Sequence, residues 1–550
     1  MESSLKSPGL LSPLRSGHWF VSGQVFYLSF LTIFSLLLYL PGLGARDFWA
    51  PVEPRYAEIA RVMLARGEWL IPTINGELYT DKPILYFWWV LLVSKLLGGV
   101  SEWSVRLPSA LSAVGLVLAT YALGRDLLGP RQGFLGAIVL ATAARVLWEG
   151  RWAHTDMPFT FFFTLALYFW ARVLFQVGSS KEILFAYALM GLATLTKGLI
   201  GVVLPGLILL SFVAWRRQWR SILEWRVPGG VGIFLLVVLP WFGQVSWATE
   251  GRWLKEFILV HHIQRYTAGA GHEQPFYYYL LNFPADLLPW TLFLVPAIGA
   301  GLRARSVVRE PIPLFLSLWF LVIFVFFSLS DTKRALYLLP LFPPAALGIG
   351  GYFAGLERGI PAEGALYRWA AQILCNLLWI AGLSLPVGVW IFQPGALWLS
   401  LLPAAAMVGG GLVGVGGVVR RRPTLVFFSI ALTVLVTMLC ASLSIFPFLD
   451  QYKSPRAFAR EVKRNVPRAE PLFIYADTMN DFNFYTEREV IPILSSPAEI
   501  NTNVSRLGKA YLLIRERDLK RIKLEEGVKI LAEGAVGEKK WYLILLQPEG

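Results

Sequence analysis

The chain has 550 residues, of which 56% are hydrophobic and only 16% are charged, with a formal net charge of +14. A soluble protein carries about 25% charged residues, so this composition excludes an ordinary soluble protein. Apolar runs long enough to span a bilayer recur along most of the chain, which is typical of a polytopic helical membrane protein. The cations lie in short loops between these runs, which argues against nucleic-acid binding.

The apolar runs predict about 13 membrane-spanning helices within residues 1–449. Their expected positions are 25–40, 107–124, 133–149, 157–175, 183–196, 199–215, 229–247, 286–302, 311–329, 335–355, 370–392, 398–419 and 424–446. The segment 83–97 is apolar but, at about 15 residues, short for a span. We interpret it as a helix along the membrane interface, because most cationic loops then fall on one side, as the cytoplasmic face requires. This choice predicts a cytoplasmic N-terminus and an extracytoplasmic C-terminus.

The character of the sequence changes after the last apolar run. Residues 450–550 are rich in charges and alternate between apolar and polar positions. A helix is expected at 454–464, followed by strands at 471–476, 490–494, 510–515 and 541–546. About 100 residues are enough for an independent fold, so we predict a small extracytoplasmic α/β domain.

With this topology, the polar loops gather on the outer face of the membrane. The predicted outer-face loop 41–106 contains the stretch Arg46–Lys82, here called the opening loop, with a helix expected at 54–66. The loops 151–158, 250–286 and 330–334 fall on the same face. The chain has no nucleotide-binding motif, so an ATP-driven pump is not indicated.

Three carboxylates on this face are candidates for the base that removes a proton from an acceptor. Asp156 precedes an apolar span, where a helix cap is the alternative role. Glu53 acts either as a base or as the partner of Arg55 in a salt bridge. For Asp47 we favour a structural role over a catalytic one.

Four other side chains at the outer face are candidates for holding a phosphate, which needs cations and hydrogen-bond donors. Lys82 is followed by a proline and an aromatic run, and Lys197 ends the apolar segment before Gly198. Arg265 and Tyr337 lie beside spans, where anchoring at the interface is the alternative.

Histidines are rare in this chain, and three of the five fall in the loop 250–286. His262 and His272, together with Asp81, are candidates for binding a divalent metal ion. Their spacing matches no strong zinc signature, so we favour ordinary hydrogen-bonded histidines and require no cofactor.

Several stretches, in the same order, resemble one known family. They are EPRYAEIARVMLARGEWLIP, YTDKPILYFW, the loop around Asp156, LTKG, HHIQRY with GHEQPFYYYL, and the stretch Lys333–Tyr337. Together they resemble the lipid A aminoarabinose transferases, which belong with the bacterial protein O-mannosyltransferase-like enzymes among the GT-C glycosyltransferases. The resemblance covers residues 25–350.

This resemblance implies a bacterial inner-membrane enzyme that takes a sugar from a polyprenyl-phosphate carrier on the periplasmic face. The sugar passes with inversion to an envelope lipid or glycan, such as lipid A. By the resemblance, Lys82, Arg265 and Tyr337 hold the carrier phosphate and Asp156 is the acidic residue of the active site. Asp81 stands where the family has a carboxylate associated with metal binding.

At one position the sequence departs from the family pattern. Val52 stands where the family has the aspartate of an Asp-Glu pair, the usual candidate for the base. Glu53 or Asp47 then takes over, or Asp156 works alone, or the acceptor is a phosphate that needs no strong base. Transfer to a protein serine or threonine, as in protein O-mannosyltransferases, is an alternative function, and so is a lipid or sugar transporter.

Overall fold

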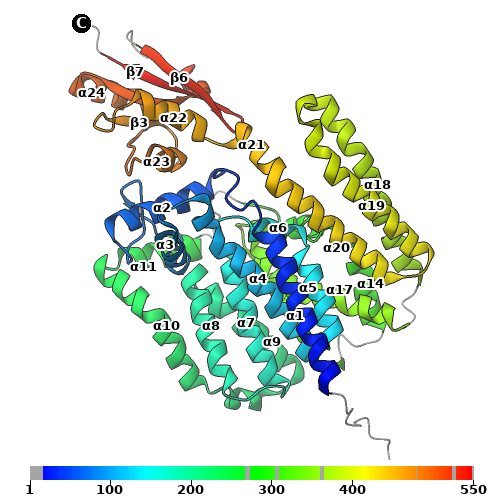
Figure 1. The fold of residues 1–550 in the computed structure, drawn as a ribbon. Coiled ribbons are helices and arrows are strands. Elements are labelled where there is room, and N and C mark those ends of the chain that lie inside the picture. Colours follow the sequence, from blue (N-terminus) through cyan, green and yellow to red (C-terminus); the bar gives the residue numbers. More distant parts are fainter. Residues whose placement is uncertain are drawn as a thin grey trace, which may run out of the picture.

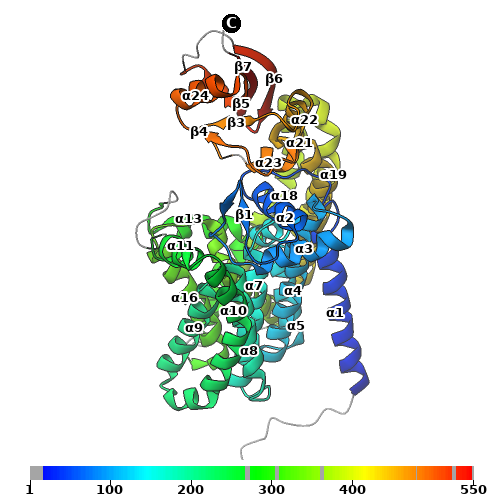
Figure 2. The same ribbon diagram turned by 90° about the vertical axis from the view of Figure 1, so that its left-hand side faces the viewer.

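The computed structural model describes residues 17–264, 266, 273–303, 309–359, 364–478, 480–522 and 528–547. It consists of a large helical bundle with a small sheet-containing region at one end (Figure 1). In both views the chain starts at the far end of the bundle and the C-terminal sheet lies beyond the opposite end (Figures 1 and 2).

The bundle is built from helices that follow the predicted apolar runs. Those of the first half are α1 Gly17–Tyr39, α2 Val52–Arg66, α3 Leu85–Leu97, α4 Glu102–Leu127, α5 Pro130–Ala141, α6 Ala144–Gly150, α7 Asp156–Leu174, α8 Glu182–Lys197, α9 Ile200–Arg216, α10 Val227–Ala248 and α11 Arg252–Ile258. Those of the second half are α13 Tyr278–Asp286, α14 Thr291–Arg303, α16 Pro311–Leu329, the 3₁₀ helix η3 Ala335–Leu341, α17 Phe342–Glu357, α18 Gly364–Phe392, α19 Leu397–Val419, α20 Pro423–Cys440 and α21 Phe446–Lys453.

Within the described ranges, eight helices are long and apolar enough to cross a membrane. The number rises to ten if two bent pairs, α5 with α6 and α13 with α14, are each one span. Each predicted span overlaps a helix, but α8 has 16 residues and α9 has 17, below the length that this criterion requires. The prediction of a polytopic helical membrane protein is therefore confirmed, and the count by length is lower than the predicted 13.

Helices α2 and α3 lie across the end of the bundle that faces the C-terminal sheet (Figures 1 and 2). The predicted helix 54–66 is α2, and the short apolar segment 83–97 forms α3, which has 13 residues. Leu92, Leu96 and Leu97 of α3 are exposed. An exposed apolar stripe on a helix this short is what a location at the membrane interface requires.

The C-terminal region, residues 450–550, contains a mixed five-stranded sheet in the order β4-β3-β5-β7-β6. Its elements are α22 Arg456–Asn465, β3 Leu472–Tyr475, α23 Asn480–Thr486, β4 Ile493–Leu494, α24 Pro497–Leu507, β5 Ala510–Arg515, α25 Glu516–Leu519, β6 Val528–Val536 and β7 Lys539–Leu546. The predicted helix and four strands are all present. Strand β6 was not predicted, and it is an edge strand whose residues are mostly exposed or only partly buried.

Polar contacts join the C-terminal region to the start of the opening loop. The Asp47 carboxylate accepts hydrogen bonds from Ser454 Oγ at 2.7 Å and from Arg456 Nη1 at 2.5 Å. In return, Asp450 accepts hydrogen bonds from the Asp47 backbone N–H and from Trp49 Nε1. The predicted structural role of Asp47 agrees with these contacts.

A second joint lies at the tip of a β-hairpin formed by β1 Thr73–Ile74 and β2 Glu77–Leu78. The two-residue turn is Asn75-Gly76, and both residues have positive φ, as a type I′ turn requires. Asn75 Oδ1 accepts hydrogen bonds from the Ile491 N–H at 2.7 Å and from Asn483 Nδ2 at 3.0 Å. Asn75 Nδ2 donates to the Ile491 carbonyl.

Candidate active site

Asp156 is the first residue of α7 and its side chain is buried. The N-cap residue of this helix is Thr155, so Asp156 does not hold the cap position. Its Oδ1 instead pairs with Lys197 Nζ at the end of α8, and its Oδ2 lies 3.1 Å from His154 Nδ1. The carboxylate therefore sits between two basic groups in an enclosed position.

His154 continues this network away from Asp156. Its Nδ1 also lies 3.4 Å from Glu149 Oε2, and Glu149 is paired through Arg145 to Asp286. Burial favours the neutral imidazole, but Asp156 and Glu149 outweigh it and raise the pKa of His154 to about 9. At neutral pH His154 is therefore an imidazolium that holds one oxygen of Asp156.

Lys197 joins Asp156 to a second candidate residue. Its Nζ lies 4.9 Å from the centre of the Tyr337 ring, and Tyr337 belongs to η3. Lys82 and Arg334 are close enough for their charges to act on Lys197. Three cations and a phenol, from three separate segments, thus lie near one another, and Lys197 links them to the Asp156 carboxylate.

Lys82 lies at the end of the opening loop, directly before the segment that forms α3. Its Nζ donates to the Asp81 carboxylate at 3.0 Å and to the Asp81 carbonyl. Asp81 Oδ1 also lies 3.4 Å from His261 Nδ1, and Tyr79 donates weakly to Oδ2 at 3.5 Å. The two neighbouring residues therefore form one charged pair beside the Asp156 cluster.

Glu53 is fully buried on α2 and its two oxygens receive six hydrogen bonds. Four come from the guanidinium groups of Arg46 and Arg106, at 2.6–3.0 Å. The other two come from the backbone N–H groups of Trp49 and Ala153. Burial favours the neutral carboxyl, but Arg106 and Arg46 outweigh it and lower the pKa of Glu53 to about 2.

These contacts correct the expectation for Glu53. Its partners are Arg46 and Arg106 and not Arg55, and no lone pair is left for an incoming proton. The hydrogen bond from the Ala153 N–H ties α2 to the loop that carries Asp156 three residues later. We therefore propose that Glu53 braces the active-site loop and does not act as a base.

The structure gives a partial view of the predicted metal ligands. Asp81 contacts His261. The Nδ1 atom of His262 instead lies 2.8 Å from the carbonyl oxygen of Phe257. His272, and the predicted phosphate ligand Arg265, lie outside the described residues. Within the described ranges no group of three His, Cys, Asp or Glu side chains could hold a metal ion.

Sequence reasoning missed Arg334 and His154. Arg334 is half-buried and directly precedes the 3₁₀ helix η3, which contains Tyr337. Its place in the polar stretch SDTKR was the available signal. His154, two residues before Asp156, carried no pattern, because its role depends on Glu149 from a neighbouring helix.

Known proteins resemble this chain over much of its length. Residues 81–243 match the family described as dolichyl-phosphate-mannose-protein mannosyltransferase. An undecaprenyl phosphate-alpha-4-amino-4-deoxy-L-arabinose arabinosyl transferase of Pseudomonas paraeruginosa is 32% identical over 396 residues, covering 70% of each chain. The transferase of the same name from Shewanella sediminis is 28% identical over 488 residues, covering 86% of each.

A solved structure shares the fold. ArnT from Cupriavidus metallidurans, crystallised with bound undecaprenyl phosphate, superposes with a TM-score of 0.77 at 21% identity. The match covers 96% of this chain and 98% of that one, so it includes the C-terminal region. The chain therefore belongs to the undecaprenyl phosphate-aminoarabinose arabinosyl transferase family, and it is a polyprenyl-phosphate-sugar-dependent membrane glycosyltransferase.

Proposed function

We propose that this enzyme transfers 4-amino-4-deoxy-L-arabinose from undecaprenyl phosphate to a phosphate group of a lipid A-like acceptor. The donor is the one named for its relatives. The observation that carries the site is that Lys197 contacts both Asp156 and Tyr337, with Lys82 and Arg334 close by.

Such a cation cluster suits the departure of a phosphate. When the bond between the anomeric carbon and the carrier phosphate breaks, its electron pair stays on the phosphate oxygen. Lys82, Lys197 and Arg334, with the hydroxyl of Tyr337, stabilise that developing charge, and preorganised donors are most effective at this point. Arg265 stays a predicted member of the same set.

The state of the carboxylates favours a phosphate acceptor. Glu53 is saturated by hydrogen bonds, Asp47 is tied to Arg456, and Asp156 is held between Lys197 and His154. None of the three is placed as a strong base. A phosphate monoester already carries an anionic oxygen, so it attacks the anomeric carbon without losing a proton, and a single displacement inverts that centre.

The arrangement of the chain supports an outward-facing site. Helices α2 and α3, which flank Lys82 in the sequence, lie at the end of the bundle nearest the C-terminal sheet, and α1 begins at the other end (Figure 1). Arginines 216, 217 and 420–422 lie in loops that the positive-inside tendency assigns to the cytoplasm. We therefore infer an inner-membrane protein with a cytoplasmic N-terminus and a periplasmic active site.

The test uses the purified protein in detergent with a panel of polyprenyl-phosphate sugars and lipid A as acceptor. Mass spectrometry then detects free polyprenyl phosphate and the modified acceptor. We expect release with the aminoarabinose donor and only when the acceptor carries a phosphate. Release that depends on a serine or threonine peptide would favour a protein acceptor, and no release from folded protein would favour transport.

A further inference from the structure

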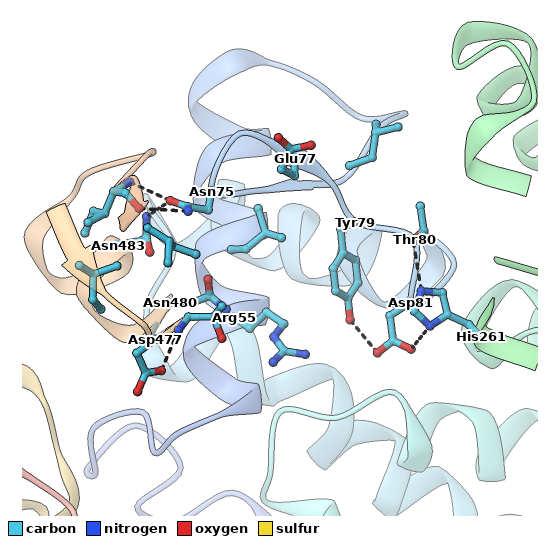
Figure 3. Close-up of a pocket in the computed structure, with 16 residues that line it drawn as sticks. Arg55, Asn75, Glu77, Tyr79, Thr80, Asp81, His261, Asp477, Asn480 and Asn483 are labelled. Carbon is cyan, nitrogen blue, oxygen red and sulfur yellow. Dashed lines mark hydrogen bonds and ion pairs between the residues drawn. The ribbon is translucent and has the colours of Figure 1, made fainter. Parts of the chain in front are cut away.

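A cavity of about 380 Å³ lies between the opening loop and the C-terminal region (Figure 3). On one side it is lined by Arg55 of α2, the β1–β2 hairpin and Tyr79–Asp81. On the other side it is lined by the segment after β3, by α23 and by residues around β4. Neither part of the molecule encloses this cavity alone.

The sheet of the C-terminal region borders the cavity at the carboxyl end of strand β3. Strand β3 pairs in parallel with β4 on one side and with β5 on the other. The chain leaves β3 toward β4 on one side and leaves β5 toward β6 and β7 on the other. Ligands of open parallel sheets bind at the carboxyl ends of strands at such a switch point. Asp477 and Thr478, which line the cavity, follow β3 at this edge.

Among the charged side chains that line the cavity, two have no ion pair within the described residues: Arg55 and the exposed Glu77. Asp477 is paired with Arg515 at 3.0 Å, and Asp81 with Lys82 at 3.0 Å. The Arg55 guanidinium is half-buried and, among the described residues, has no hydrogen bond or ion pair. Figure 3 shows it pointing into the space between Asn480 and the Tyr79–Asp81 segment. An unpaired, half-buried guanidinium calls for an anionic ligand.

Beside several aliphatic side chains, the lining carries polar groups that can bind carbohydrate hydroxyls. They comprise the hydroxyls of Thr80 and Thr478, the Asn480 amide and the phenol of Tyr79. Asp81 lines the cavity and directly precedes Lys82, a predicted ligand of the carrier phosphate. The cavity therefore opens beside the place where the sugar leaves its carrier.

We propose that this cavity binds a phosphorylated sugar of the acceptor, with Arg55 pairing with its phosphate and the loop after β3 contacting its hydroxyls. This inference rests on the proposed function and gives the C-terminal region a role in acceptor recognition. A guanidinium suits the task because its planar fork binds phosphate through two hydrogen bonds.

The experiment measures binding of glucosamine 1-phosphate to the purified full-length protein by isothermal titration calorimetry, without turnover. Arg55→Gln is expected to weaken binding at least about tenfold, the loss of a charged hydrogen bond. The matched control is Arg66→Gln, which removes the same charge from the same helix but outside the cavity. Asn480→Asp, nearly identical in size, places a carboxylate beside Arg55 and is expected to weaken binding as well.

Further binding measurements identify which site binds glucosamine 1-phosphate. Glucosamine without phosphate is expected to bind wild type and Arg55→Gln equally, and undecaprenyl phosphate is expected to bind both equally. Unchanged glucosamine 1-phosphate binding in folded Arg55→Gln and Asn480→Asp overturns the proposal. Binding that is lost in Lys82→Ala but kept in Arg55→Gln also overturns it, since the probe then occupies the carrier site. If glucosamine 1-phosphate binding depends on Arg55 but no sugar is transferred to lipid A, the proposed function is wrong and the cavity is still supported as a binding site for a phosphorylated sugar.

Discussion

At the scale of single residues, the state of Asp156 is set by its two partners. Lys197 holds one oxygen and His154 the other, so the carboxylate is anionic and fixed in orientation. A carboxylate in this state orients the lysine that faces the carrier phosphate. It also stabilises positive charge on the sugar as the bond to the carrier breaks.

Removing either charge of this cluster is expected to stop transfer. In Asp156→Asn the side chain keeps its shape but loses the charge that positions Lys197, and Lys82→Ala removes a cation from the carrier phosphate. We expect activity to fall by about 10²–10³-fold in each, as for the loss of a preorganised stabilising group. Release of polyprenyl phosphate is the measurement, with size-exclusion profiles as the control for folding. Full activity in both variants would contradict the assignment.

His154 is expected to make stability depend on pH. The pKa of its imidazole rises from 6.5 to about 9 in the folded protein, so folding favours the protonated form. This contribution is complete below pH 6.5 and is lost as the pH rises through about 9. The thermal midpoint should therefore fall between these pH values in wild type and fall less in His154→Gln. If the thermal midpoints of wild type and His154→Gln changed with pH in parallel, His154 would not be the charged group that this prediction requires.

At the scale of elements, α2 is fixed by a buried charge cluster at its first turn. Glu53 binds Arg46 from the opening loop, Arg106 from α4 and the backbone before Asp156. One carboxylate thereby joins three segments that meet at the site. The guanidinium groups of Arg46 and Arg106 are both buried. Among the described residues, Glu53 is the only carboxylate within hydrogen-bonding distance of either group.

Replacing this carboxylate is expected to destabilise the fold. Glu53→Gln leaves Arg46 and Arg106 buried without a counter-charge, which costs about 3–5 kcal/mol. Glu58→Gln is the matched control on the same helix, because burial already raises the pKa of Glu58 to about 7. Thermal midpoints and the yield of monodisperse protein measure the difference. A Glu53→Gln protein of normal stability but without activity would restore Glu53 as the base.

At the scale of the whole molecule, the C-terminal region is held by the opening loop and not by an apolar interface alone. Asp47 and Asn75, at the two ends of that loop, both bind it through side-chain hydrogen bonds. The loop then continues directly to Asp81 and Lys82. The position of the C-terminal region is thus coupled to the charged pair at the active site.

Loss of the Asn75 amide is expected to loosen this joint. Asn75→Gly keeps the positive φ of the turn but leaves the Ile491 backbone groups without their partner, at a cost of about 1–3 kcal/mol. Amide hydrogen exchange of residues 488–494 should become faster. Arg66→Gln breaks only the exposed ion pair with Glu489 and should change exchange little, since such pairs contribute about 0–1 kcal/mol. Equal exchange in wild type and Asn75→Gly would contradict the joint.

Much of the architecture was predictable because it follows from local patterns. Apolar runs specified the helices of the bundle, and the change of composition near residue 450 specified the sheet region. The candidate site was only partly predictable. Asp156, Lys197 and Tyr337 were proposed one by one, whereas the salt bridge expected between Glu53 and Arg55 was wrong, because the partner Arg106 is 53 residues away.

By itself, the sequence determined the membrane class, the helices, four of the five strands of the C-terminal sheet and the family, since hydropathy and short motifs are properties of neighbouring residues. Only the tertiary structure decided which charges pair. It placed His154 between two carboxylates, saturated Glu53 and left Arg55 facing the cavity beneath the C-terminal sheet. The physical reason is that the state of a charged group depends on burial and on partners brought from distant segments, and neither is written in the local sequence.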